Sequence, residues 1–428
     1  MSDGPTNHPL GEAQRAFVQP DLDGDLDPFE RFNRAQGAGA MRDPYPIFAE
    51  LRKQGGVAVI NPATFLGTAP DEELPDMPDV YSAVSYDAVA EVLRDAKRFS
   101  SRGYEMFMGP VMGHTILEMD EPEHGRVRGL LQQAFTRKAL ERWEHELVRP
   151  VVSRLVDRFA DRGRADLVRE LTFPFPVEVI AGMLGLPEEE HETFHRLAIE
   201  LISVTLDPEA GLRGSQGLKQ MFARALEARR REPGEDLISV LARAELDDGT
   251  KLDDELIYSF CRLLAPAGAE TTYRSSSNLL FGLLSHPEQL DAVRTDRSLI
   301  PQAIDEGLRW ECPLTGIQRT CAEDTEVAGV RIPEGQMVHV NLGSANRDET
   351  RWDDPDSFDV FRPLKAHIAF AFGPHRCLGI HLATMETRVV LETLFDRLPN
   401  LRLDPDAEDV HITGMAFRSP LELPVHFD

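Results

Sequence analysis

Apolar residues recur at helical spacing along most of the chain after Asp43. Such spacing is typical of amphipathic helices that bury one face. In residues 138–162 the apolar positions that form one such face are Leu140, Trp143, Leu147, Val151, Leu155 and Phe159. Residues 253–284 and 380–398 show the same periodicity. The pattern therefore predicts several long helices.

Capping signals suggest where two further helices begin. Ser285 and Glu288 have the spacing of a capping box, which predicts a helix start at Ser285. Pro301 is expected to open another helix, because proline is tolerated in a first helical turn.

Strand signals are fewer and short. Residues 57–60 predict one strand, and residues 412–425 allow several short ones. Residues 325–342 predict a β-hairpin that turns through Ile332-Pro-Glu-Gly335. Residues 1–40 are rich in Gly, Asp and Pro, and we interpret them as a loose N-terminal arm. Because no linker divides residues 41–428, we expect one large domain, mainly α with small β-sheets.

Composition narrows the classes of function. The chain of 428 residues carries 46 Lys and Arg against 73 Asp and Glu, a formal net charge of −27. This balance argues against binding nucleic acid or anionic membranes, since both require a basic face. No segment has the roughly 20 unbroken apolar residues of a membrane helix. The N-terminus lacks the basic start and apolar run of a secretory signal, so we expect a cytoplasmic protein.

One of the four cysteines stands in an unusual setting. Cys377 lies in a stretch rich in Gly, Pro and aromatics, directly before the helical pattern of 380–398. Unpaired N–H groups and the positive end of the helix dipole would stabilise its thiolate. A thiolate can bind a soft or redox metal, and haem iron is an established partner. The alternative is an inert buried cysteine on a tight turn.

The residues around Cys377 resemble the haem-binding loop of the cytochrome P450 family. The matching positions are Phe370, Gly373, His375, Cys377 and Gly379. Ala371 stands where the family usually has its first glycine. The resemblance implies a single-domain cytochrome P450 fold over residues 41–428 and a heme b cofactor. It also implies that Cys377 is the axial iron ligand, with Phe370 and Gly379 beside the haem.

A second motif agrees with this resemblance. Glu306 and Arg309 form a Glu-x-x-Arg pair on one helical face, some seventy residues before Cys377. Alone, such a pair is usually a weak surface contact. In the family the pair joins a later arginine, here Arg362, in a structural network. The resemblance therefore implies a structural role for these three residues, not a catalytic one.

A third motif interrupts the predicted helix 253–284. Residues 267–272 read Ala-Gly-Ala-Glu-Thr-Thr and follow Pro266. Proline and glycine together predict a kink with a local widening of the helix; a simple packing kink is the alternative. The segment resembles the family's oxygen-binding turn. By that match Glu270 and Thr271 are the acid and alcohol that deliver protons during O2 activation.

Haem propionates need cationic partners, because buried carboxylates are costly when unpaired. By the resemblance, His124 and Arg128 lie in a segment that contributes to the propionates, and Arg319 and His375 stand at matching positions. Any one of them taken singly could be an ordinary surface residue.

The resemblance also places apolar substrate contacts in separated segments. The candidates are Phe107, Met108, Val111, Met112, Leu264, Ala267, Leu314, Ile317, Met415 and Phe417. Ordinary core packing is the alternative for each. We expect a medium-sized apolar substrate such as a terpenoid, steroid or fatty acyl compound.

The implied function is a haem-dependent monooxygenase that inserts one oxygen atom from O2 into this substrate. The chain lacks a Gly-x-Gly-x-x-Gly dinucleotide fingerprint, so electrons should come from a ferredoxin reduced by a flavoprotein ferredoxin reductase. The basic residues expected on the cysteine side are Arg126, Arg137, Lys138 and Arg376. Two alternatives are a haem-binding sensor or carrier without turnover and a peroxide-driven enzyme or isomerase on the same fold. The acid–alcohol pair argues against both.

Overall fold

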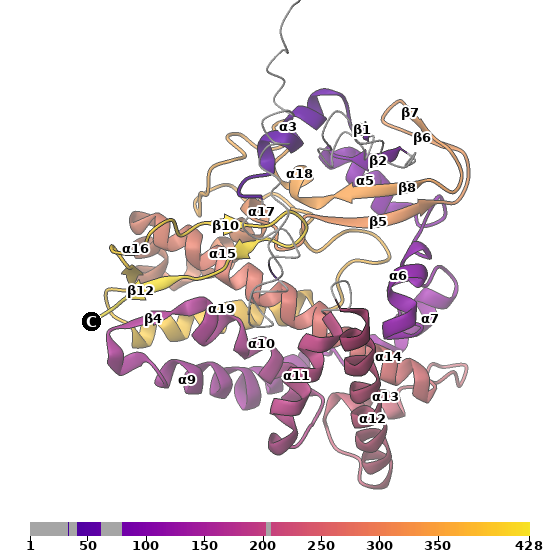
Figure 1. Ribbon diagram of the computed structural model, residues 1–428, viewed down its shortest axis with the longest axis horizontal. Helices are drawn as coiled ribbons and strands as arrows, with labels where there is room; N and C mark the ends of the chain where they lie inside the picture. The colour runs from indigo at the N-terminus through magenta and orange to yellow at the C-terminus, as the bar shows by residue number, and fades with distance from the viewer. Residues whose placement is uncertain (1–32, 34–40, 61–78, 203–206) are drawn as a thin grey trace, which may run out of the picture.

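Helices build most of the molecule in the computed structural model, which describes residue 33 and residues 41–60, 79–202 and 207–428 (Figure 1). The α-helices are α3 (Tyr45–Lys53), α5 (Tyr86–Arg94), α6 (Gly103–Met112), α7 (Glu123–Gln132), α8 (Arg137–Trp143), α9 (Arg149–Asp157), α10 (Pro174–Met183), α11 (His191–Ile202), α12 (Pro208–Arg231), α13 (Leu237–Arg243), α14 (Asp254–Leu264), α15 (Thr271–Ser285), α16 (Pro287–Thr295), α17 (Ile300–Trp310), α18 (Leu342–Asn346) and α19 (Ile380–Arg397). Three π-helical segments join some of them: η1 (Glu144–Val148), η3 (Val168–Thr172) and η6 (Ala265–Glu270). The predicted arm 1–40 lies outside the described residues except for Asn33, which is buried.

The strands form small sheets at the edges of the helices. They are β1 (Val57–Ile60), β2 (Val80–Ala83), β3 (Phe99–Ser100), β4 (Arg164–Asp166), β5 (Gly316–Cys321), β6 (Thr325–Val327), β7 (Val330–Ile332), β8 (Met337–Asn341), β9 (Arg402–Leu403), β10 (Ile412–Thr413), β11 (Ser419–Pro420) and β12 (Pro424–His426). The largest sheet has the order β1-β2-β8-β5-β3, and a second has the order β4-β12-β9. In Figure 1 the large sheet lies with α3, α5 and α18 at the top, and the helical part lies below.

The main hydrophobic core lies between α9, α10, α15, α17 and α19. Leu279 of α15, Leu308 of α17 and Val389 of α19 are buried in the same cluster. A separate cluster packs α5 against the large sheet, with Val89 and Val340 fully buried. The segment before Cys377 contacts this second cluster through Ile368, so the predicted haem loop lies where the two cores meet.

Several predicted elements are confirmed. The strand at 57–60, the short strands within 412–425 and the helix after Cys377 are all present. The helix predicted to begin near Pro301 starts at Ile300. The segment 138–162 is helical, but it is divided by the π-helical η1 between α8 and α9.

The predicted hairpin of 325–342 is wrong in its turn. β6 pairs with β7, so the chain reverses at Ala328 and Gly329, which have φ values of 49° and 81°. Two left-handed residues give the turn that best matches the twist of a two-residue hairpin. The chain then turns again before Met337, and β8 pairs with β5 and β2 instead.

The predicted capping box at Ser285 is also wrong. Ser285 is the last residue of α15, and α16 begins at Pro287 after His286, whose side chain makes no cap hydrogen bond. Proline at the first helical position needs no N–H partner and starts the helix without a side-chain cap. Among the described residues, no helix is both long and apolar enough to cross a bilayer.

Candidate active site

The loop before α19 is shaped by two residues with left-handed backbone. Ala371 has φ 55° and Gly373 has φ 73°. The Cys377 N–H donates to the Phe370 carbonyl at 2.9 Å, which closes the loop. A Cβ on Gly373 would lie 2.3 Å from the Leu93 carbonyl oxygen, so only glycine fits there. Ala371 adopts this left-handed conformation although its methyl group disfavours it.

Cys377 differs from the other cysteines in its surroundings. Cys377 is exposed on one side, whereas Cys261, Cys312 and Cys321 are buried. Partial burial raises the pKa of the Cys377 thiol, while the Gly379 N–H and the charges of Arg128 and Arg376 act to lower it. The expected stabilisation by the helix start is therefore present. It does not dominate, because desolvation outweighs it.

Cationic and imidazole groups gather beside this loop. The rings of His124 on α7 and His375 lie 3.9 Å apart between centroids. The His124 Nε2 is buried and has no hydrogen-bond partner among the described residues. Burial, His124 and the charges of Arg319 and Arg128 lower the pKa of His375 to about 3. The cluster is thus built to meet negative charge.

Arg319 on β5 is the most buried cation of the cluster. It is 5% exposed, and its Nη1 donates to the Gln318 carbonyl at 2.7 Å. No carboxylate forms an ion pair with it among the described residues. Burial lowers the pKa of Arg319, with Tyr104 and Asp120 opposing this shift. A buried guanidinium without an acid is costly and favours an anionic ligand.

Arg128 joins the cluster to the cysteine loop. Its Nη2 donates to the Arg376 carbonyl at 2.7 Å, and its charge acts on Cys377. The structure therefore brings together all four residues predicted for propionates, around one side of the Cys377 loop.

The predicted kink is a π-helical widening. The segment η6 separates α14 from α15, with Pro266 near its start. The Thr271 hydroxyl donates to the Ala267 carbonyl, four residues earlier, at 2.8 Å. It therefore competes with the helix backbone for this carbonyl. Thr271 is partly exposed, whereas Glu270 is buried. The acid and the alcohol therefore share one turn but have different surroundings.

Glu270 forms a buried ion pair that the sequence analysis missed. Its Oε1 accepts from the Arg274 Nε at 2.7 Å and from the Arg274 Nη2 at 2.5 Å. Arg274 also donates to Asn33 and Ser419. Burial raises the pKa of Glu270, and Arg274 opposes this shift. Glu270 and Arg274 are four residues apart and so lie on one helical face, a spacing from which the ion pair could have been predicted.

A second buried acid lies next to this turn. Glu386 of α19 is 3% exposed. Burial raises its pKa to about 8, and a hydrogen bond with Thr272 opposes this shift. Its position could not be found from local sequence, because it depends on how α19 packs against α15.

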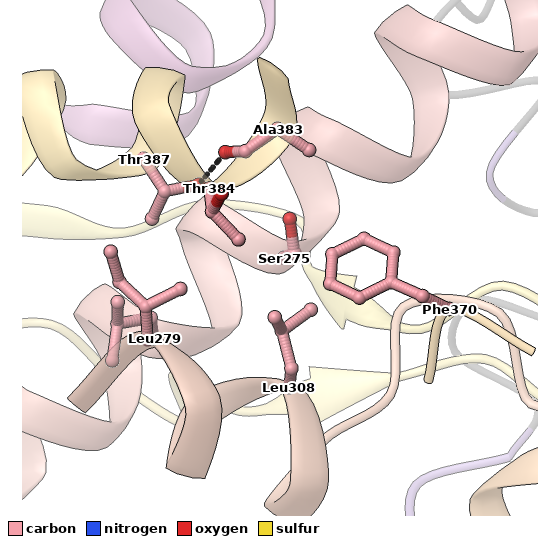
Figure 2. Close-up of a pocket in the computed structure, with 8 residues that line it drawn as sticks. Ser275, Leu279, Leu308, Phe370, Ala383, Thr384 and Thr387 are labelled. Atoms are coloured by element: carbon pink, nitrogen blue, oxygen red, sulfur yellow. Dashed lines mark hydrogen bonds between the residues drawn. The ribbon is translucent and has the colours of Figure 1, made fainter. Parts of the chain in front are cut away.

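Figure 2 shows a small pocket beneath the cysteine loop, where Phe370 points between α15, α17 and α19. Ser275, Leu308 and Thr384 line it, and the Thr387 hydroxyl donates to the Ala383 carbonyl at 2.9 Å. With a volume of about 10 Å³ the pocket is too small for a cofactor. It marks where Phe370 packs the loop onto the helical core.

The Glu-x-x-Arg residues Glu306 and Arg309 form a buried network with Arg362. Arg309 donates through Nε and Nη2 to the two carboxylate oxygens of Glu306, at 2.7 and 2.8 Å. Arg362 donates to Glu306 at 3.2 Å. Arg309 also donates to the carbonyls of Asn346 and Pro355. The network ties α17 to the irregular segment that leads into the cysteine loop.

The predicted substrate segments have mixed surroundings. Val111 and Met112 are buried at the end of α6, and the side chain of Phe107 lies outside the described residues. Leu314 pairs with Phe417 in an isolated β-bridge, so two separated segments do meet. The others are partly buried or exposed: Met108, Leu264, Ala267, Ile317 and Met415. Met415 packs against the small cluster around α3.

Comparison with known proteins decides the family. A sequence profile described as "Cytochrome P450" matches residues 213–413. The chain is 35% identical to the cytochrome P450 monooxygenase PikC of Streptomyces venezuelae over 383 residues, which cover 86% of this chain and 87% of that protein. The chain belongs to the cytochrome P450 family. It is therefore an oxidoreductase of the monooxygenase class that uses O2, a substrate and redox partners, and its cofactor is heme b.

Solved cytochrome P450 structures agree with this fold. CYP109Q5 from Chondromyces apiculatus is 37% identical, with a TM-score of 0.81 over 90% of this chain and 95% of that chain. CYP109E1 from Bacillus megaterium, solved with testosterone, is 30% identical, with a TM-score of 0.80 over 90% of this chain and 99% of that chain. These matches confirm the expected single domain, mainly α with small β-sheets.

The residues around Cys377 fit heme b. Heme b carries two carboxylates. Among the described residues, the buried Arg319 pairs with no acid and the buried Nε2 of His124 has no hydrogen-bond partner. Gly379 places no side chain near the Cys377 sulfur, since a Cβ there would lie 4.0 Å from it. The donor set and its charge therefore match the group that the family binds.

Proposed function

We propose that Cys377 holds the haem iron and that His124, Arg128, Arg319 and His375 hold the propionates. The observation that supports this most strongly is the buried guanidinium of Arg319, which pairs with no carboxylate among the described residues and lies in the cluster beside an accessible cysteine. Phe370 and Gly379 border the same group, because they flank Cys377 in one closed loop. We propose residues 41–428 as the domain that carries this site.

We further propose that Glu270 and Thr271 manage protons for O2 activation. Heme b supplies the redox chemistry when bound. Thr271 holds its hydroxyl at the widened turn against the Ala267 carbonyl, and Glu270 is a buried acid one residue away. Because its pKa is raised by burial, Glu270 is better suited to give a proton near neutral pH than an exposed carboxylate.

The substrate that we propose is an apolar molecule of medium size, such as a terpenoid, steroid or fatty acyl compound. The buried C-terminal end of α6, with Val111 and Met112, and the Leu314–Phe417 bridge support this, because they are apolar and come from separate segments. The relative solved with testosterone has bound a compound of this class. Phe107, Met108, Leu264, Ala267, Ile317 and Met415 remain further candidates for this pocket.

We propose a ferredoxin, reduced by a flavoprotein reductase, as the electron donor. Arg126, Arg137, Lys138 and Arg376 are all exposed on or near α7, α8 and the cysteine loop. Arg376 is bonded through its carbonyl to Arg128, so the basic residues begin next to the proposed iron ligand. An acidic partner would be attracted there despite the net charge of −27. Such donors work in the cytoplasm, which is the location that we propose.

The experiment reconstitutes the protein with a surrogate ferredoxin and its reductase and adds testosterone as the probe. We expect nicotinamide oxidation that depends on the probe and yields an oxygenated product. Thr271→Ala should divert most reducing equivalents to peroxide or water. Haem binding with no turnover under any donor would favour a sensor or carrier. Turnover only with added peroxide would favour the peroxide-driven alternative.

The docking hypothesis has its own control. Arg137→Glu with Arg376→Glu should slow electron transfer and weaken its dependence on salt. Arg331→Glu removes an exposed charge on the β6–β7 hairpin and should change neither. Unchanged rates in the double variant would rule out this docking surface.

A further inference from the structure

A small cavity lies beside η6, and Glu270 is one of the residues that line it. It is bounded by Val177 on α10, His195 and Ile202 on α11, and Pro266 and Glu270 on η6. Its volume is about 20 Å³. A water molecule needs about 10–15 Å³ of such space and two or more polar partners. The cavity is therefore large enough for a single bound water.

Two polar side chains, His195 and Glu270, line this mostly apolar cavity. The Nε2 of His195 is buried and has no hydrogen-bond partner among the described residues. Leaving such a buried nitrogen without a hydrogen-bond partner costs free energy. On Glu270, Arg274 occupies Oε1, and no hydrogen bond to Oε2 is formed within the described part of the chain. A water between Nε2 and Oε2 would satisfy both groups.

His195 also reaches toward the outside. The residue is partly exposed although its Nε2 is buried, and its ring packs against Phe173 with 5.9 Å between centroids. An imidazole can take a proton at one nitrogen and release one from the other. His195 can therefore connect solvent to the cavity without opening a channel beside the substrate.

We propose that His195 and one water in this cavity form the route by which solvent protons reach Glu270. The proton enters at the outer ring nitrogen, another leaves Nε2 to the water, and the water protonates Glu270 at Oε2. One proton moves inward, and no electrons are transferred. His195 acts through Glu270, so its role rests on the proposed function of that acid.

The charges around the route favour this transfer. Burial lowers the pKa of His195, and the charge of Glu178 on α10 opposes that shift. Burial raises the pKa of Glu270, and Arg274 of α15 opposes that shift. The two pKa values therefore move toward each other, which favours proton transfer between the groups.

The test measures coupling, the share of reducing equivalents recovered in product, in the reconstituted holoenzyme with testosterone. His195→Phe keeps the ring packing but removes the relay. We expect coupling to fall at least about threefold, since positioned proton transfer contributes factors of 10²–10⁴. Ala198→Val fills the cavity from α11 while His195 and Glu270 stay intact, and it should lower coupling similarly. Haem content and probe binding should stay at wild-type levels in both.

The glutamate variants separate the possible failures. If Glu270→Gln keeps full coupling, the proposed role of the acid is wrong. If Glu270→Gln loses coupling but His195→Phe and Ala198→Val do not, the acid acts and the His195 route is overturned. In the double variant His195→Phe with Glu270→Gln, coupling equal to that of Glu270→Gln alone supports one shared route. A further loss would mean that His195 acts elsewhere, which also overturns the proposal.

Discussion

Replacing Glu306 by alanine should strongly destabilise the protein, although Glu306 lies in a network that we assign no part in chemistry. Glu306 is 5% exposed, accepts from Arg309 and Arg362, and also accepts from the Asp359 N–H at 2.9 Å. Its removal leaves two largely buried cations and one N–H without their acceptor. Removing one partner of a buried ion pair costs about 3–5 kcal/mol, and here we expect the upper part of that range.

This energy corresponds to a measurable shift in melting temperature. An unfolding entropy of about 2.1 cal/mol/K per residue gives about 0.9 kcal/mol/K for a chain of 428 residues. A loss of about 4–5 kcal/mol should therefore lower the midpoint by roughly 5 °C. Glu306→Gln, which keeps part of the hydrogen bonding, should fall between the wild type and Glu306→Ala.

The assay is thermal unfolding of the holoprotein, followed by circular dichroism and by haem absorbance. Glu235→Ala is the matched control, because Glu235 is 76% exposed and pairs with Arg142. Exposed pairs contribute about 0–1 kcal/mol, so the control should shift the midpoint by about 1 °C at most. If Glu306→Ala melted together with Glu235→Ala, the view of this network as a structural lock would be wrong.

Three other predictions follow from the site. Gly373→Ala should lower the ratio of haem to protein several-fold, because its Cβ would meet the Leu93 carbonyl. Gly335 has a similar positive φ but open space around it, so Gly335→Ala should keep full haem content. Arg319→Ala should speed the loss of haem to a haem acceptor by at least about tenfold, since it removes the most buried cation of the cluster; equal loss rates would contradict its propionate role. Glu386 keeps its proton in the folded protein up to about pH 8 but loses it near pH 4.5 when unfolded, so it destabilises the fold progressively as pH rises through this window. Glu386→Gln should therefore gain stability over wild type by about 1.4 kcal/mol per pH unit above 4.5, as measured by urea unfolding from pH 5 to 8, and a gain independent of pH would refute this reading.

Most of the correct predictions rest on residues that are close together in the sequence. The kink at η6 follows from Pro266 and Gly268, which weaken helix hydrogen bonding wherever they stand. The position of Cys377 before α19 follows from a loop that cannot be helical and a helix pattern that begins directly after it. The Glu306–Arg309 pair follows from spacing on a helix, although only the fold shows that it is buried.

Features that depend on distant parts of the chain could not be predicted. The strand β5 pairs with β8, although residues 322–336 separate the two strands along the chain. No local sequence pattern predicted this pairing. Arg274 binds Asn33, which comes from the far N-terminal region, and so completes the surroundings of Glu270. The burial that raises the pKa of the Cys377 thiol could not be foreseen, because desolvation depends on packing that the local dipole argument does not contain.

The central claim, that Cys377 holds the iron of heme b, is tested most directly by the carbon monoxide difference spectrum of the reduced protein. We predict a strongly red-shifted Soret band in the wild type and its loss in Cys377→Ala, while Cys321→Ala, at a buried cysteine, keeps the band. A wild-type band typical of histidine ligation, or a red-shifted band that survives in Cys377→Ala, would contradict the claim.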